Sequence, residues 1–256
     1  MANFFESKNP VLNEDKLKKS SLERNVTTEQ TGPITRQNDE AMTVNGAVNK
    51  TFLLFGLMMV TTCISWMMPS NFLLIVGAVG GLILAIAGAF KPQWSPTVAP
   101  GYALFEGLFL GTISYYYANA FYPGIIVQAV GLTMGTLVMM LLIYKSGLIK
   151  VTGKFKTGVL MATGAIMLMY VVSFVGSFFG FNVPYLHDNG PIGIGISVVI
   201  IGVAALNLLI DFDLFEKGEK YQAPKYMEWF AGMALLITLV WLYIEFLRLL
   251  SKLNRD

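Results

Sequence analysis

The sequence predicts an all-α integral membrane protein with a bundle of seven transmembrane helices. Of its 256 residues, 55% are hydrophobic and only 13% are charged, whereas an ordinary soluble domain has roughly 25% charged residues. Seven stretches approach the length of about 20 apolar residues with which a helix crosses a bilayer. They are Phe52–Met68, Asn71–Phe90, Gly101–Ala118, Gly124–Tyr144, Gly158–Phe179, Pro191–Phe215 and Met227–Leu250.

Two domains follow from this pattern. Residues 1–48 mix acidic, basic and small polar residues and have almost no apolar runs, a composition typical of disorder. They are predicted to be a largely disordered tail, and residues 49–256 the membrane domain. The net charge of +2 indicates no nucleic-acid partner. The single cysteine, Cys63, excludes a disulfide within the chain.

The distribution of Lys and Arg predicts the orientation. These residues are concentrated in the tail and after the second, fourth and sixth apolar stretches, whereas the alternate loops 69–70, 119–123 and 180–190 contain none. Because basic loops stay on the cytoplasmic side, the N-terminus is predicted to be cytoplasmic. Arg248, Lys252 and Arg255 do not fit, since seven crossings would put them outside. Either the earlier loops decide the orientation or the last stretch does not cross fully.

The second and sixth stretches are rich in glycine, with the sequences GAVGGLILAIAG and GPIGIGISVVIIG. Small residues allow membrane helices to approach closely. Both segments are therefore predicted to pack tightly on neighbouring helices.

Once the charges of the tail, the loops and the ends of the stretches are set aside, five charged residues remain, and four of them are acidic: Glu106, Asp211, Asp213, Glu245 and Arg248. A charge at membrane depth costs roughly 2.5–3.5 kcal/mol on insertion scales, so each must pair, be protonated or face a polar interior. Glycines at Gly107 and Gly111 predict that Glu106 faces a neighbouring helix, where it could simply be protonated. The only histidine, His187, falls in a loop and is expected to be solvated.

The two aspartates require separate explanations, because residues two apart on a helix point about 200° apart. Asp213 precedes Lys217 by four residues, the favourable order for a local ion pair. Asp211 has no base three or four residues away, so its partner is expected on another helix. Glu245 can pair locally with Arg248. If Asp211 instead meets Glu245, the two carboxylates are expected to share one proton and to titrate as a unit.

The segments NLLIDFDLFEKG (207–218) and LVWLYIEFLRLL (239–250), with FEGLFLG in the third stretch, resemble the Bax-inhibitor family, the transmembrane Bax-inhibitor-motif proteins and their bacterial relatives. The resemblance covers the chain from about Lys50 onward. It implies a bundle with the last helix at the centre and a pH-sensitive calcium leak gated by a carboxylate pair. Here that pair would be Asp211 and Glu245. The resemblance also implies a bacterial inner (cell) membrane location.

Three features depart from the family pattern. Glu245 stands where the family has an aspartate, and the charged tail is additional. The chain between the two carboxylates is also long, since a helix running straight from Lys225 would put Glu245 about 30 Å along its axis. Contact with Asp211 would then require PKYMEWFAG (224–232) to lie along the membrane interface and the crossing helix to begin near Gly232.

Two functions compete. In the first, Asp211 and Glu245, with Glu106 and Asp213, bind or gate a hard cation in a pH-sensitive leak channel or transporter; oxygen ligands suit calcium, and protons are the other candidate. In the second, the protein regulates a membrane partner such as a protease and transports nothing. No enzyme activity is predicted, because no Gly-x-Gly-Asp motif of an intramembrane aspartyl protease is present, and no cofactor is expected apart from calcium itself.

Overall fold

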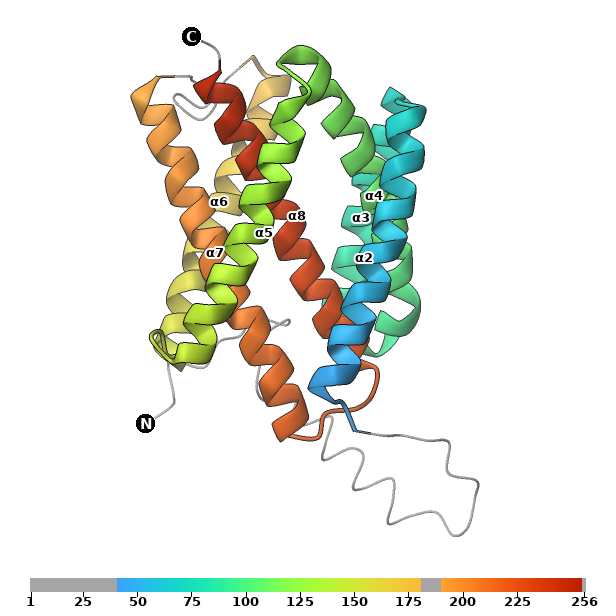
Figure 1. Cartoon of the computed structure of the whole chain (residues 1–256), viewed down its shortest axis with the longest axis vertical. Helices are drawn as coiled ribbons and strands as arrows, with labels where there is room; N and C mark the ends of the chain where they lie inside the picture. The colour runs from blue at the N-terminus through green and yellow to red at the C-terminus, as the bar shows by residue number, and fades with distance from the viewer. Residues whose placement is uncertain (1–40, 181–189, 255–256) are drawn as a thin grey trace. The chain divides into compact units, whose positions relative to one another are not determined.

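The computed structural model describes residues 41–180 and 190–254, and Figure 1 gives the labels of their elements. Within these ranges the chain forms seven α-helices and one short 3-10 helix, η1 (Pro92–Trp94), and no strand. The α-helices are α2 (Val44–Met67), α3 (Asn71–Phe90), α4 (Ser95–Ala120), α5 (Gly124–Ser146), α6 (Gly153–Phe178), α7 (Pro191–Lys220) and α8 (Met227–Leu253). Each corresponds to one predicted stretch, so the all-α membrane fold with seven helices is confirmed.

Several helices extend beyond the predicted apolar stretches, because their polar ends are closed by capping residues. α2 begins at Val44, where the Thr43 hydroxyl accepts a hydrogen bond from the Gly46 N–H at 2.9 Å. α6 begins at Gly153, where Thr152 accepts from the Phe155 N–H at 3.2 Å. Both caps satisfy N–H groups that have no partner within the helix. Hydropathy finds the part of a helix inside the bilayer, and the caps determine where the helix begins.

Six of the described helices are apolar enough to cross a membrane by composition alone, and α4 is the exception. α4 has 26 residues, more than the length needed to span a bilayer. Its composition includes Glu106, two prolines and four tyrosines. These residues lower its hydropathy, and Glu106 is among the residues buried inside the protein.

The helices form two compact units. Unit 1 contains the described residues up to Tyr115 together with Asp211–Ile237, and unit 2 contains Tyr116–Ile210 together with the chain from Thr238 onward. α4, α7 and α8 each contribute to both units. An apolar 18-residue stretch of α8 is 78% buried, whereas the corresponding stretches of the other five apolar helices are 11% to 39% buried. The prediction that the last helix is the inner one is therefore confirmed.

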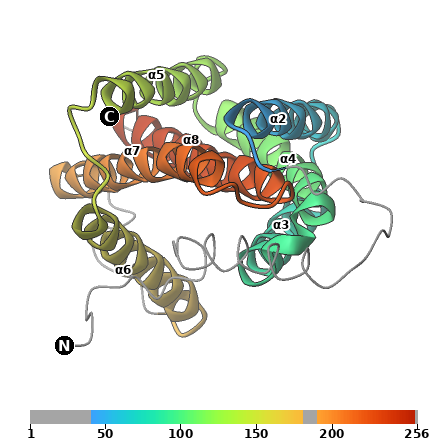
Figure 2. The same cartoon turned by 90° about the horizontal axis from the view of Figure 1, so that it is seen from below.

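In unit 1, α4 lies between α2 and α3 and packs on both through glycine (Figure 2). A Cβ atom added to Gly77 of α3 would lie 2.5 Å from the Phe109 nitrogen of α4. A Cβ atom on Gly111 of α4 would lie 2.2 Å from the Thr62 carbonyl oxygen of α2. Both distances are far below van der Waals contact, so only glycine fits. The tight packing predicted for the second apolar stretch is confirmed.

The same prediction is wrong for two glycines of the sixth stretch. A Cβ atom added to Gly195 or Gly202 of α7 would meet no described atom within 4 Å. Unit 2 is joined instead by polar contacts between helices. The Asn207 amide of α7 donates to the Thr163 hydroxyl of α6 at 2.8 Å. In membranes, side-chain hydrogen bonds of this kind are a second way to hold helices together.

Candidate ion-binding and gating site

Glu106 lies inside unit 1, as its neighbouring glycines predict. The residue is 9% exposed, and its Oε2 atom is 2.5 Å from the position that a Cβ atom would take on Gly81 of α3. Gly107 faces the other way, with Thr61 and Met58 of α2 against it. Glycine on α3 therefore makes the space in which this carboxylate sits.

Asp211 and Asp213 of α7 are both buried, with 6% and 7% exposure. Although they point to different sides of the helix, the neighbouring residues Leu208–Ile210 and Leu214–Phe215 are buried as well. This part of α7 is thus enclosed nearly all round. The predicted local pair of Asp213 is confirmed, with the Lys217 Nζ atom 3.3 Å from its Oδ2 atom.

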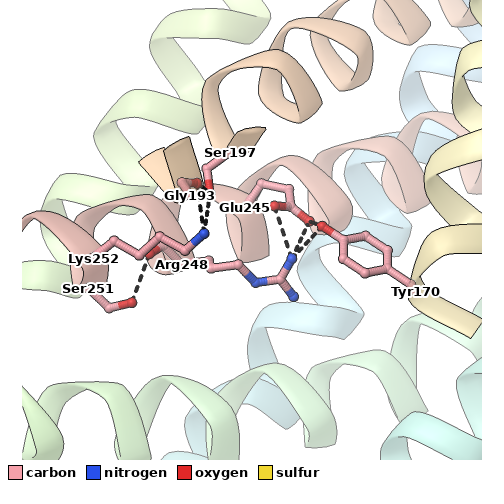
Figure 3. Close-up of polar contacts among 7 residues, drawn as sticks. All are labelled: Tyr170, Gly193, Ser197, Glu245, Arg248, Ser251 and Lys252. Atoms are coloured by element: carbon pink, nitrogen blue, oxygen red, sulfur yellow. Dashed lines mark hydrogen bonds and ion pairs between the residues drawn. The ribbon is translucent and has the colours of Figure 1, made fainter. Parts of the chain in front are cut away.

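Glu245 of α8 is 1% exposed and lies in unit 2, where it has two partners (Figure 3). The Tyr170 hydroxyl of α6 donates to its Oε1 atom at 2.7 Å. The Arg248 Nη1 atom, one turn along α8, donates to Oε1 at 3.1 Å and to Oε2 at 3.2 Å. The local ion pair, one of the two alternatives for Glu245, is therefore present.

Tyr170 completes a triad with these two charged residues. Its hydroxyl also accepts a hydrogen bond from Arg248 Nη1, and the guanidinium carbon lies 4.8 Å from the centroid of the Tyr170 ring. A cation over an aromatic face is stabilised by the ring quadrupole. The triad Tyr170–Glu245–Arg248 thus fastens α6 to α8 and neutralises a buried carboxylate within unit 2.

Two of the three bases that do not follow the loop pattern, Arg248 and Lys252, make their contacts inside unit 2, and Arg255 lies outside the described residues. Lys252 is 5% exposed, and its Nζ atom donates to the Gly193 carbonyl at 2.9 Å and to the Ser197 hydroxyl at 3.0 Å (Figure 3). Arg248 is bound to Glu245. The positive-inside rule concerns bases in loops beside the membrane, and these two bases lie within a helix and its contacts.

α8 is one helix from Met227 to Leu253, so the structure does not show the helix start near Gly232 that a contact between Asp211 and Glu245 was expected to require. Gly232 is instead a packing residue, since a Cβ atom there would lie 3.0 Å from the Thr51 hydroxyl oxygen. Counted along the helices, Glu245 lies about 27 Å from the start of α8 and Asp211 about 13 Å from the end of α7. Asp211 belongs to unit 1 and Glu245 to unit 2. Their pairing stays a prediction.

A metal site would need further ligands. Within residues 41–180 and 190–254, no three His, Cys, Asp or Glu side chains come together in a group able to hold a metal ion. Calcium usually takes 6–8 oxygen ligands, so Asp211 and Glu245 could supply only part of such a shell. His187 lies outside the described residues.

One buried carboxylate, Glu228 in the first turn of α8, was not predicted. It is fully buried, and its Oε1 atom accepts hydrogen bonds from the Thr43 N–H at 3.1 Å and the Thr43 hydroxyl at 3.2 Å. Lys225 Nζ lies 3.2 Å from the same oxygen. Glu228 therefore caps α2 from another helix, and the contacts span 185 residues of sequence. The sequence offers one signal, an acidic residue in the first turn of a predicted helix. That signal indicates stabilisation of the N-terminus of α8 itself, and not a cap on α2.

The chain was also compared with known proteins. A family model described as Bax inhibitor 1 like matches residues 9–255. The chain belongs to the Bax inhibitor 1 like family. The match begins within the tail, so the view of the whole tail as an addition to the family pattern is wrong. No curated protein matches the chain. As a Bax inhibitor 1 like protein with six described helices apolar enough to span a bilayer, it is an integral membrane protein in contact with lipid.

Proposed function

We propose that this Bax inhibitor 1 like protein is a pH-sensitive leak channel or transporter for calcium or another cation. The observation that supports this most strongly is the acidic interior of unit 1. Glu106, Asp211 and Asp213 are each at most 9% exposed in membrane helices, and no Lys or Arg in the described part of this unit is buried. Buried carboxylates without buried bases favour cations over anions. The protein would carry out no chemical step.

The proposed gate is the pair Asp211 and Glu245. With one shared proton the pair holds α7 and α8 together. Without the proton, two like charges in a low dielectric repel each other or attract a cation. In the structure Glu245 is bound to Arg248 and Tyr170, so forming the pair requires Glu245 to exchange Arg248 for Asp211. Arg248 therefore competes with Asp211 for Glu245, so substitution of Arg248 also tests the proposal.

The test is calcium and proton flux into liposomes containing the purified protein, measured as a function of pH. Asp211→Asn and Glu245→Gln are each expected to flatten the pH dependence. The double variant is expected to add little, because both changes remove one coupled unit. Glu219→Gln, an exposed carboxylate on the same helix as Asp211, is the matched control and should keep the wild-type profile.

Arg248→Gln separates this gate from a merely structural role of Glu245. Removing Arg248 takes away the partner that competes with Asp211 for Glu245, so the pH profile of flux should differ from that of the wild type. If both single carboxylate variants keep the wild-type profile, the gate is wrong. If the purified protein moves neither ion, the alternative is preferred, in which the protein binds a membrane partner such as a protease.

We propose a bacterial inner membrane location with a cytoplasmic N-terminus, as the loop lysines predict.

Glu106 is proposed to be a cation ligand along the same path. Glu106→Gln should keep the fold, since an amide and a protonated acid are similar in shape and polarity, and should reduce flux. Equal flux and higher stability in Glu106→Leu would show that the carboxylate has no role in transport.

A further inference from the structure

Two lysines of unit 1 lie over tryptophan rings instead of beside carboxylates. The Lys50 Nζ atom of α2 is 4.6 Å from the centroid of the Trp229 ring of α8. The Lys91 Nζ atom, just after α3, is 4.2 Å from the centroid of the Trp94 ring of η1. Both distances are within the range of a cation–π contact. Each ammonium group is thus held in place by a ring that leaves its positive charge uncompensated.

Both pairs lie at the same end of unit 1. The Ser95 hydroxyl, next to Trp94, donates to the Tyr226 carbonyl beside the start of α8 at 2.8 Å. The start of α2 is fixed to the same place by Thr43 and Glu228. Helix ends in a membrane protein lie near the boundary between lipid and water, where tryptophan is enriched and where lysine extends its ammonium toward the headgroups.

The other lysines at this end show why the two pairs are distinctive. Lys217 and Lys225 are bound to Asp213 and Glu228, so their charges are already balanced. Within the described residues, Lys50 and Lys91 make no ion pair. Lys220 is exposed, and among the described residues it has no carboxylate partner and lies over no aromatic ring. Among the described lysines at this end, Lys50 and Lys91 are the two that the protein orients and leaves with hydrogen-bond donors for a group outside it.

We propose that Lys50 and Lys91 bind the phosphate groups of anionic phospholipids, and that Trp229 and Trp94 orient the two ammonium groups at headgroup depth. Phosphate is the anion present at that depth, and it accepts the hydrogen bonds that an ammonium group donates. A base near an anionic membrane surface gains about 1 kcal/mol. Each lysine should therefore enrich anionic over neutral lipid about fivefold at its position.

The experiment uses quenching of tryptophan fluorescence by brominated lipid. In a Trp66→Phe/Trp241→Phe background, only Trp94 and Trp229 report. The full chain is placed in phosphatidylcholine vesicles that contain the same fraction of either brominated phosphatidylglycerol or brominated phosphatidylcholine. Brominated phosphatidylglycerol should quench several-fold more efficiently. Lys50→Gln should remove the excess quenching at Trp229, and Lys91→Gln should remove the excess quenching at Trp94. The two signals are separated by changing the other of these two tryptophans to phenylalanine in each measurement.

Two matched variants control for loss of folding and for nonspecific electrostatic attraction between lysines and anionic lipid. Lys220→Gln removes one charge from the same end of the same unit and should keep the full preference. Lys50→Arg keeps the charge and should retain the excess at Trp229. Equal quenching by the two brominated lipids in the parent protein overturns the proposal. The proposal is also overturned if the preference for brominated phosphatidylglycerol survives in Lys50→Gln and Lys91→Gln. The same holds if the preference is lost equally in Lys220→Gln, or if inorganic phosphate in solution abolishes it.

Discussion

Most described glycines of unit 1 lie against neighbouring residues, with Gly56 as an exception, whereas most described glycines of unit 2 face space that no described side chain fills, with Gly124 as an exception. Cβ atoms added to Gly107 and Gly111 would approach α2 within 2.3 Å, but those added to Gly131 and Gly135 of α5 would meet nothing within 4 Å. The same residue type therefore has opposite meanings in the two units. A glycine pattern shows where helices can approach closely, and only the facing surface decides whether they do.

The two units also differ in charge. The described part of unit 1 has the acids Glu106, Asp211, Asp213, Glu216, Glu219 and Glu228 against the bases Lys50, Lys91, Lys217, Lys220 and Lys225. The described part of unit 2 has the acid Glu245 against the bases Lys145, Lys150, Lys154, Lys156, Arg248 and Lys252. The buried charges in the described part of unit 1 are all acids, whereas unit 2 buries Glu245 together with Lys156 and Lys252. Three carboxylates of the proposed cation path, Glu106, Asp211 and Asp213, lie in unit 1, whereas Glu245 of the proposed gate lies in unit 2.

The largest expected effect tests the contrast between the glycines. Gly107→Ala should destabilise the protein by about 1–3 kcal/mol, the usual cost of overpacking, because the new methyl group collides with the Met58 carbonyl. Gly131→Ala should instead be neutral or stabilise by up to about 1 kcal/mol, since alanine is the better helix former and the site is open. Unfolding in detergent micelles measures both. Equal destabilisation by the two changes would contradict the difference in packing.

A smaller effect is expected at the acid that caps α2. Glu228→Gln keeps the shape but removes a charge-assisted bond to the Thr43 N–H and the ion pair with Lys225. The expected loss is about 1–2 kcal/mol, of which little comes from Lys225 because that lysine is partly exposed. Glu219→Gln is the comparison, since Glu219 is exposed and, among the described residues, its carboxylate accepts one hydrogen bond, from the Val44 N–H at 3.2 Å. A loss at Glu219 as large as that at Glu228 would argue against burial as the cause.

The smallest effect is expected at the triad of unit 2. Tyr170→Phe removes the hydroxyl that bonds Glu245 and Arg248 but leaves their ion pair and the aromatic ring. Hydrogen bonds between membrane helices contribute about 0.6 kcal/mol on average, so the loss of stability should be of that order. Tyr170→Leu also removes the ring under Arg248 and should cost more. Unfolding of the two variants side by side provides the check, and identical values would show that the ring contact contributes nothing.

Hydropathy predicted all seven helices because the bilayer constrains every spanning segment in the same way. Local spacing predicted the contacts that depend only on one helix, namely Asp213 with Lys217 and Glu245 with Arg248. It could not predict Tyr170, which lies 75 residues before Glu245, or the cap of α2 by Glu228. Such partners are chosen by how helices pack, and a single sequence carries no record of that. Hydropathy also predicted one stretch, Met227–Leu250, through Gly232, and α8 runs through that glycine without a break.

The contact between α2 and α4 has a mechanical consequence. Cβ atoms on Gly107 and Gly111 would lie 2.3 Å and 2.2 Å from the Met58 and Thr62 carbonyl oxygens, so the same backbone contact repeats after four residues on both helices. Glycine Cα–H groups facing carbonyls in this way add weak hydrogen bonds to close packing. Sliding one helix by a single residue breaks both contacts at once, and the next matching register lies a full turn of about 5.4 Å away. We therefore expect α2 and α4 to move as one rigid body, so that any opening motion of unit 1 takes place at its other helix contacts.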